Sequence, residues 1–173
     1  MGGLAATWLA AREPSLISGL ILLAPGFGLK ERILDLAAVD ETDMEGGGKE
    51  GDGRREGKRE GFVFPSNYCE DLQLGYEMVE DMRVGPHSDE EELAATLRTP
   101  LFIAHGADDD AVPQQASRSF FDRVKASPSK AYHLFQREDH RLSGALHTQE
   151  GGAPGIVAAA CEFINAARCA GPH

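Results

Sequence analysis

A short continuous apolar run covers residues 20–25, and the segment G-F-G at 26–28 breaks it. Such a run is typical of strands that are buried on both faces of a sheet. Residues 99–104 and 131–135 are two further strand candidates. We therefore predict three strands of a parallel sheet.

Helical patterns lie around these runs. Residues 1–12 are small and apolar on every side, which suits a helix buried against a sheet, and Pro14 ends that helix. Pro113 opens a second helix, since proline is tolerated at the first turn. Residues 154–167 place apolar side chains at helical spacing and predict a third. The alternation indicates the α/β class with right-handed crossovers. Because three strands leave one edge bare, we expect neighbouring strands upstream of Met1.

Two segments interrupt the alternation. Residues 40–61 hold seven glycines, eight acids and five bases with Met44 as the one apolar residue, so we expect a disordered insertion there. Residues 62–97 look helical and acidic, with nine carboxylates against one arginine between Ser66 and Leu97. We interpret this second segment as a cap-like helical excursion.

Composition narrows the classes of partner. With 173 residues, of which 42% are hydrophobic, the chain suits one soluble globular domain over 1–173. Its formal charge is −11 and its pI about 4.9, so its field repels nucleic acid and anionic membrane surfaces. No apolar run approaches the roughly 20 residues that a membrane span needs. The oligomeric state stays open, although a bare sheet edge predicts association.

The cysteines and the N-terminus bear on location. Cys69, Cys161 and Cys169 are odd in number and form no CxxC pair, which favours free thiols in a reducing compartment. The first residues carry no recognisable targeting signal. We expect an intracellular protein, cytoplasmic or mitochondrial, whose N-terminal targeting region lies outside this chain.

The strongest chemical signal is the segment H-G-A-D-D-D-A-V-P that starts at His105. It follows a predicted strand, where functional residues collect in α/β sheets. A buried carboxylate there can orient an imidazole and stabilise its charged form during acyl transfer. The alternative is an aspartate-rich turn that caps the next helix without any chemistry.

A histidine follows the last predicted strand in the segment E-D-H-R-L-S at 138–143. In that loop His140 can reach an acid and a nucleophile and act as general base. His133 and His147 are more simply exposed histidines. A metal site built from the aspartates at 108–110 and these histidines is a further alternative, but a spacing of seven between the histidines fits no recognised ligand pattern.

These two loops resemble the acid and base loops of the α/β-hydrolases. The matching residues are H-G-x-x-D-x-x-V-P from His105 and D-H-R-L at 139–142, in the family's order of acid before base. Within the superfamily the chain looks most like the branch of acyl-protein thioesterases and carboxylesterases that includes mitochondrial palmitoyl-protein thioesterases. It is also similar to proline-iminopeptidase-like serine aminopeptidases.

The resemblance implies a role for particular residues. It makes Asp109 the catalytic acid and His140 the base, and leaves Asp108 and Asp110 as turn and capping groups. F-P-S-N-Y at 64–68 looks like the start of that branch's cap. The implied fold is the C-terminal half of an α/β-hydrolase, without its N-terminal strands and nucleophile strand.

The first three residues resemble the second half of the family's nucleophile elbow, Gly-x-Ser-x-Gly-Gly. The serine would then precede Met1, the backbone N–H of Met1 would help bind the oxyanion, and Gly2 and Gly3 would be elbow remnants. A flexible start is the simpler alternative for two glycines. The other serines, such as Ser66, Ser88, Ser117 and Ser143, have no elbow context.

The resemblance therefore implies a serine hydrolase that cleaves acyl esters or thioesters of small molecules or acylated proteins, with no cofactor and no metal. This chain would hold the acid and base of a Ser-His-Asp triad without its serine. The alternative is a non-catalytic remnant or interaction protein of the same fold.

Overall fold

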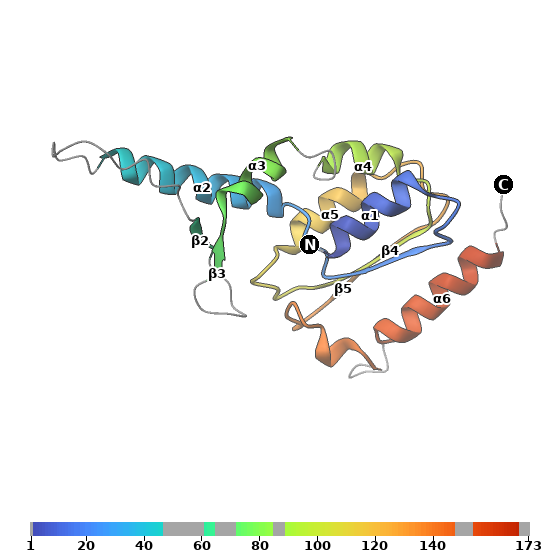
Figure 1. Ribbon diagram of the computed structural model, residues 1–173. Coiled ribbons are helices and arrows are strands. Elements are labelled where there is room, and N and C mark those ends of the chain that lie inside the picture. The colour runs from blue at the N-terminus through green and yellow to red at the C-terminus, as the bar shows by residue number, and fades with distance from the viewer. Residues whose placement is uncertain (1, 47–60, 65–71, 85–88, 148–153, 170–173) are drawn as a thin grey trace. The chain divides into compact units, whose positions relative to one another are not determined.

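Figure 1 shows the computed structural model of the protein, which describes residues 2–46, 61–64, 72–84, 89–147 and 154–169. The chain forms two compact units. The first, here called the sheet unit, contains Met1–Phe27 and Asp89–His173. The second, the hairpin unit, is Gly28–Ser88.

The sheet unit is built on three parallel strands in the order β1-β4-β5. The strands are β1 (Leu20–Leu23), β4 (Leu101–Gly106) and β5 (Lys130–Phe135), which confirms the prediction from the apolar runs. All six residues of the central strand β4 are buried, as expected where helices cover both faces of a sheet.

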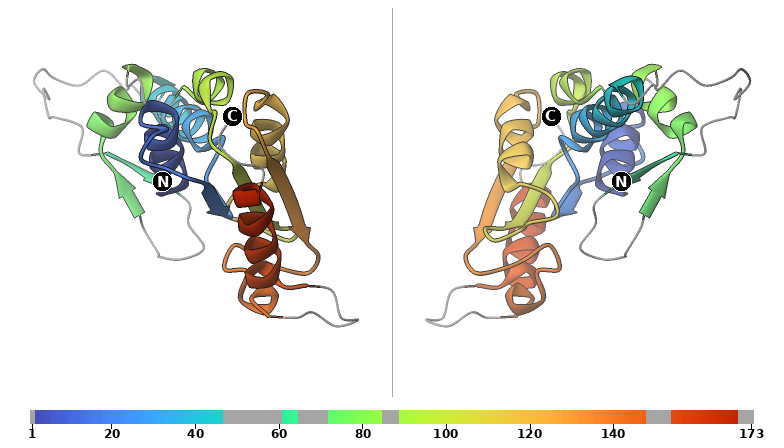
Figure 2. Two further views of the ribbon diagram at one scale, coloured as in Figure 1. Left: turned by 90° about the vertical axis from the view of Figure 1, so that its right-hand side faces the viewer. Right: turned by 90° about the vertical axis from the view of Figure 1, so that its left-hand side faces the viewer.

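Helices cover the two faces of this sheet unequally. Figures 1 and 2 show α1 (Gly2–Arg12), α4 (Glu90–Thr96) and α5 (Gln114–Arg123) on one face, and α6 (Ile156–Cys169) on the other. The helices predicted at 1–12, after Pro113 and at 154–167 correspond to α1, α5 and α6. The α/β class predicted for the chain is confirmed.

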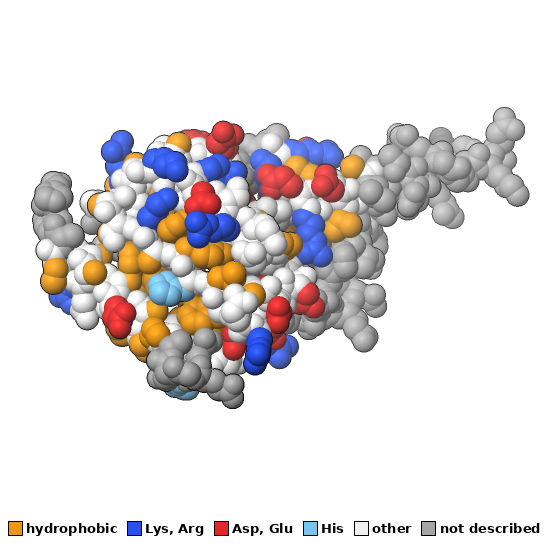
Figure 3. All heavy atoms as spheres, turned by 180° about the vertical axis from the view of Figure 1, so that it is seen from behind, with side chains coloured by type: hydrophobic (Ala, Val, Ile, Leu, Met, Phe, Trp, Pro, Cys, Tyr) orange, Lys and Arg blue, Asp and Glu red, His pale blue; other side chains and the backbone are white. Residues whose placement is uncertain are grey.

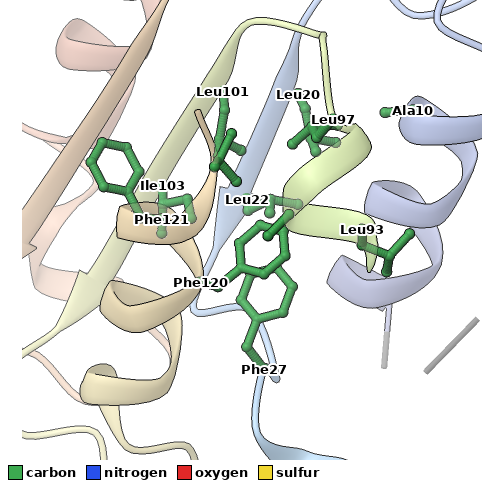
Figure 4. Close-up of a cluster of buried hydrophobic side chains, with 12 residues drawn as sticks. Ala10, Leu20, Leu22, Phe27, Leu93, Leu97, Leu101, Ile103, Phe120 and Phe121 are labelled. Carbon is green, nitrogen blue, oxygen red and sulfur yellow. The ribbon is translucent and has the colours of Figure 1, made fainter. Parts of the chain in front are cut away.

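Alternate residues of β4 serve two different cores. Leu101 and Ile103 pack with the three-helix side, in the cluster drawn in Figure 4, where Phe27 and Phe120 stack with ring centroids 3.9 Å apart. Phe102 and Ala104 face α6 instead, together with Phe163. This two-residue alternation is the ordinary geometry of a strand, so β4 is held rigidly between both layers.

The outer strands are less covered. On β1 the side chains of Ile21 and Leu23 are 39% and 49% exposed, and among the described residues β1 pairs only with β4. Near the other outer strand, β5, the side chains of Lys130 and Arg118 lie over the ring of Phe121, which belongs to α5. Figure 3, which views the molecule from behind, shows Lys and Arg side chains next to a group of hydrophobic ones.

The hairpin unit combines two helices with a short antiparallel hairpin. Its elements are α2 (Leu29–Gly46), β2 (Phe62–Phe64), β3 (Leu72–Leu74) and α3 (Tyr76–Val84). Ile33, Ala37 and Val79 form its core. No helix in the described ranges is both long and apolar enough to cross a membrane.

The structure corrects two predictions in this unit. The insertion predicted to be disordered over 40–61 is helical up to Gly46, because no glycine or proline precedes that position to stop α2. Residues 47–60 lie outside the described part of the chain. The excursion over 62–97 begins with strands rather than a helix, since F-V-F has the aromatic and β-branched residues that favour strands.

Of the described residues after β3, 76–84 and 90–96 are helical, but these two helices do not form one segment. The helices α3 and α4 belong to different units, which divide at Ser88. Asp89 caps α4 by accepting the backbone N–H of Glu91 and Glu92. Of the cap-like segment at 64–68, residues 65–68 lie outside the described residues.

Candidate active site

The two predicted catalytic residues meet at one edge of the sheet. Asp109 follows the end of β4 and His140 follows the end of β5, and parallel strands carry their carboxyl ends to the same edge. His140 Nδ1 lies 2.8 Å from Asp109 Oδ2. The structure thus brings together an acid and an imidazole that are 31 residues apart.

Backbone bonds hold the Asp109 carboxylate in place. Its side chain is fully buried, and Oδ1 accepts the backbone N–H of Ala111 at 3.0 Å and of Val112 at 2.8 Å. A carboxylate makes charge-assisted bonds with such donors, which fix its orientation. Oδ2 is therefore directed at His140 by the local turn as well as by the imidazole itself.

His140 is more accessible, with a side-chain exposure of 30%. An ionised carboxylate only accepts hydrogen bonds, so Nδ1 of His140 carries the proton and Nε2 of the neutral ring does not. This tautomer is the one that can take a proton from an alcohol. Leu142, two residues further on, adopts a left-handed backbone conformation with φ 54°. It is only 2% exposed, so its burial anchors the loop to the core.

Gly106 allows the two loops to approach. A Cβ at this position would collide with the carbonyl oxygens of Glu138 and Asp139, the latter at 2.6 Å. The backbone N–H of Asp108 donates to the Glu138 carbonyl at 3.0 Å, and that of Ala107 donates to Phe135 at 2.9 Å. The loops of the acid and the base are therefore joined directly, backbone to backbone.

A second histidine also contacts Asp109, and the motif alone did not indicate its role. His105 Nε2 lies 2.9 Å from Asp109 Oδ2, and His105 Nδ1 lies 2.8 Å from Ser117 Oγ. This looks like a Ser-His-Asp arrangement. However, His105 and Ser117 are both 0% exposed, so a substrate cannot reach this serine.

The remaining polar candidates have other surroundings. Asp108 and Asp110 are exposed, and α5 begins after Pro113 with no side-chain cap, so the prediction that these aspartates cap it is wrong. The proline takes the capping position itself. His133 is partly buried, with its ring 5.1 Å from that of Phe102, while His147 is exposed.

In the part of the chain that the structure describes, no set of three or more His, Cys, Asp or Glu side chains is placed to hold a metal ion.

The predicted elbow remnant lies only partly in the described chain. Met1 is outside the described residues, while Gly2 and Gly3 begin α1. A Cβ on Gly3 would lie 2.9 Å from Cβ of Pro25, just beyond the carboxyl end of β1, whereas one on Gly2 would meet nothing within 4 Å. The start of α1 thus packs at the same edge of the sheet as the Asp109–His140 pair.

The other serines do not approach His140 through any described bond. Ser66 and Ser88 lie outside the described residues, and Ser143 is an exposed residue of the short 3-10 helix Ser143–Ala145.

One cavity, of about 870 Å³, lies at the opposite end of the sheet. Its lining includes Gly19 and Pro100, which precede β1 and β4, and neither Asp109 nor His140. It is therefore remote from the chemistry of the acid and the base.

Comparison with known proteins places the fold. No family model and no curated protein matches the chain. Among solved structures, Est1E from Butyrivibrio proteoclasticus is similar at 21% identity with a TM-score of 0.64, over 96% of this chain and 58% of that one. Alpha/beta hydrolase domain-containing protein 10 from mouse is similar at 20% identity with a TM-score of 0.61, over 97% and 56%.

A further structure, of ferulic acid bound to Est1E, matches at 22% identity with a TM-score of 0.50, over 80% of this chain and 47% of that one. The chain thus has the α/β-hydrolase fold and spans less than two thirds of the length of these neighbours. The predicted C-terminal half of the fold is confirmed, since acid loop, base loop and final helix follow in order on a parallel sheet.

Proposed function

We propose that the protein is a serine hydrolase that cleaves acyl esters or thioesters. The observation that carries the proposal is the contact of 2.8 Å between Asp109 Oδ2 and His140 Nδ1 at the carboxyl edge of the sheet. A buried acid bonded to a partly exposed imidazole is the acid–base half of a Ser-His-Asp triad.

In this mechanism His140 acts through Nε2. It takes the proton of a serine hydroxyl as the serine oxygen bonds to the acyl carbon, and then gives the proton to the leaving alcohol or thiol. Asp109 holds Nδ1–H and stabilises the imidazolium. Water then attacks the acyl-serine, with His140 again as base, and the acid product leaves. No cofactor takes part in these steps.

We assign the nucleophile to a serine directly before Met1, and the elbow's second half to Gly2 and Gly3. The packing of Gly3 against Pro25 supports this assignment, because an elbow helix must start close against the sheet beside the acid and base loops. The backbone N–H of Met1 would then contribute to the oxyanion hole.

Two observations support the proposed substrate class: a ligand of a structural neighbour and the resemblance of the acid and base loops. Est1E has been seen with ferulic acid, a carboxylic acid of the kind that hydrolysis of an acyl ester releases. The resemblance of the two loops to acyl-protein thioesterases and carboxylesterases adds thioesters and acylated proteins as substrates. We infer that the activity lies inside the cell and that the excursion over 62–97 has the role of a cap.

The reading frame upstream of Met1 gives the first test. The proposal expects Gly-x-Ser immediately before Met1, and any other sequence there would overturn the assigned nucleophile.

Turnover gives the second test. The protein with those residues present should hydrolyse short-chain p-nitrophenyl esters and acyl thioesters, and His140→Ala should lower kcat by about 10⁴-fold or more. His147→Ala is the matched control, since His147 is exposed and follows the same loop. Equal activity of the two variants would contradict the role of His140. A wild type that turns over neither esters nor thioesters would contradict the proposal and favour a non-catalytic protein of the same fold.

A further inference from the structure

His105 is a fully buried titratable residue that the proposed reaction does not use. It lies in β4, four residues before Asp109, and its side chain is 0% exposed. Its ring nitrogens contact groups on both sides: Val112 O at 3.0 Å and Asp109 Oδ2 at 2.9 Å for Nε2, and Ser117 Oγ at 2.8 Å for Nδ1. Each of these partners comes from the segment that carries or follows the acid.

The partners decide which nitrogen of His105 is protonated. A backbone carbonyl can only accept a hydrogen bond, and so can an ionised carboxylate, so Nε2 must be the donor. The Ser117 hydroxyl has a single proton, for which His105 Nδ1 at 2.8 Å and the Gln114 carbonyl at 3.0 Å compete. Because that carbonyl also accepts from the Tyr132 hydroxyl at 3.2 Å, the Ser117 proton can go to Nδ1. The contacts are therefore satisfied by a neutral ring with its proton on Nε2.

This proton closes a loop of bonds around Asp109. His105 Nε2–H donates to the carbonyl of Val112, and the N–H of the same Val112 donates to Asp109 Oδ1 at 2.8 Å. Val112 is thus held from both sides. The turn 109–112 cannot rotate the carboxylate away from His140 without breaking one of these bonds.

We propose that His105 is a positioning residue, which as a neutral Nε2–H imidazole locks the turn 109–112 and so holds Asp109 Oδ2 against His140. The inference rests on the proposed function, because it gives His105 a purpose only if Asp109 orients a catalytic base. Ser117 supports the role by fixing the far side of the ring.

The hydrogen bonds around His105 extend further through Ser117. Ser117 Oγ lies 3.3 Å from the hydroxyl of Tyr132 and 3.0 Å from the carbonyl of Gln114. Titratable groups in the described network are Asp109 and Tyr132, with His140 beyond the first and Arg118 over the ring of the second. The network therefore couples α5 and β5 to the acid loop.

Nitrogen-15 NMR of the purified chain tests the proposal. At neutral pH, His105 should show a protonated Nε2 and an unprotonated Nδ1, and His140 a hydrogen-bonded proton on Nδ1 that exchanges slowly with water. His105→Leu removes the donor to Val112, and the His140 proton should then exchange about tenfold faster.

Two variants separate positioning from bulk packing. His105→Gln can place an amide N–H at the position of Nε2, so it should restore most of the protection of the His140 proton against exchange. If His105 only filled space in the core, glutamine would restore no more protection than leucine. Ser117→Ala should give an intermediate loss, and Ser119→Ala, at an exposed position of the same helix, none. If His105→Leu does not fold, the proposal is tested by the protonation of the two His105 ring nitrogens in the wild type and by the effect of Ser117→Ala on the His140 proton.

Each negative result has a distinct meaning. A charged His105, or one protonated on Nδ1 alone, overturns the positioning role. So does a His140 proton that is indifferent to His105→Leu and Ser117→Ala, although the proposed function then stands. A wild-type chain with no bonded proton on His140 Nδ1 would overturn both the inference and the acid–base pair.

Discussion

Replacement of Gly106 by alanine should separate the acid loop from the base loop. The added Cβ would collide with the carbonyl oxygens of Glu138 and Asp139, which belong to backbone and cannot swing aside as a flexible side chain would. The loop that bears His140 must therefore move away from the end of β4.

The magnitude follows from what that movement breaks. Overpacking a tight contact costs about 1–3 kcal/mol of unfolding free energy. The movement also strains the bond from Asp108 N–H to the Glu138 carbonyl, and a typical hydrogen bond contributes about 1 kcal/mol. We expect Gly106→Ala to lower the unfolding free energy by about 2–4 kcal/mol.

Urea unfolding measures this loss, and the protected proton on His140 Nδ1 reports the geometry of the pair. Gly19→Ala is the matched control, because a Cβ there meets nothing within 4 Å. A Gly106→Ala chain as stable as the Gly19→Ala chain, with the His140 proton retained, would refute the reasoning about loop approach.

Two further predictions concern the core and the tyrosine beside Ser117. Phe120→Ala empties a site that is 0% exposed and stacks on Phe27, so it should lower the unfolding free energy by about 3–5 kcal/mol in urea titration; a loss below 1 kcal/mol would contradict the packing. Burial raises the pKa of Tyr132, with the Ser117 hydrogen bond acting the other way. The unfolded chain therefore loses this proton first, and stability should fall as pH rises above the ordinary tyrosine value of 10.0. Ultraviolet titration should show one late-ionising tyrosine that Tyr132→Phe removes; an unchanged titration would count against it.

The sheet and the location of the site followed from the sequence for a physical reason. The central strand β4 is buried along its whole length and is apolar up to Ala104, whereas the outer strands β1 and β5 also have exposed positions. Once these runs are parallel strands, segments that follow them lie at one edge, and Asp109 and His140 are neighbours without any further assumption.

The hairpin of the hairpin unit was harder to predict, because its two strands have only three residues each and pair with one another. Residues 62–64 make a strand only by pairing with 72–74, which local pattern does not show. The helical part of residues 40–61 has no glycine or proline before Gly46, a local feature that composition averaged over the whole segment does not show.

The proposed role of His105 could not be predicted from the sequence for a similar reason. The motif H-G-x-x-D shows that the histidine precedes the acid, but its partners Val112 and Ser117 are set by how the turn folds back and by how α5 packs on β4. The need for glycine at Gly106 likewise comes from the loop after β5, which lies more than thirty residues further along the chain.

The assignment of Asp109 as the acid is the central claim, and three adjacent aspartates allow a direct test. In a chain extended by the proposed Gly-x-Ser before Met1, the measurement is ester turnover by Asp109→Asn beside Asp108→Asn and Asp110→Asn. Asp108 and Asp110 are exposed, whereas the Asp109 side chain is fully buried against His140. We predict that Asp109→Asn lowers kcat by about 10⁴-fold while the other two stay within about tenfold of the wild type. Equal losses in all three, or activity retained in Asp109→Asn, would contradict the account.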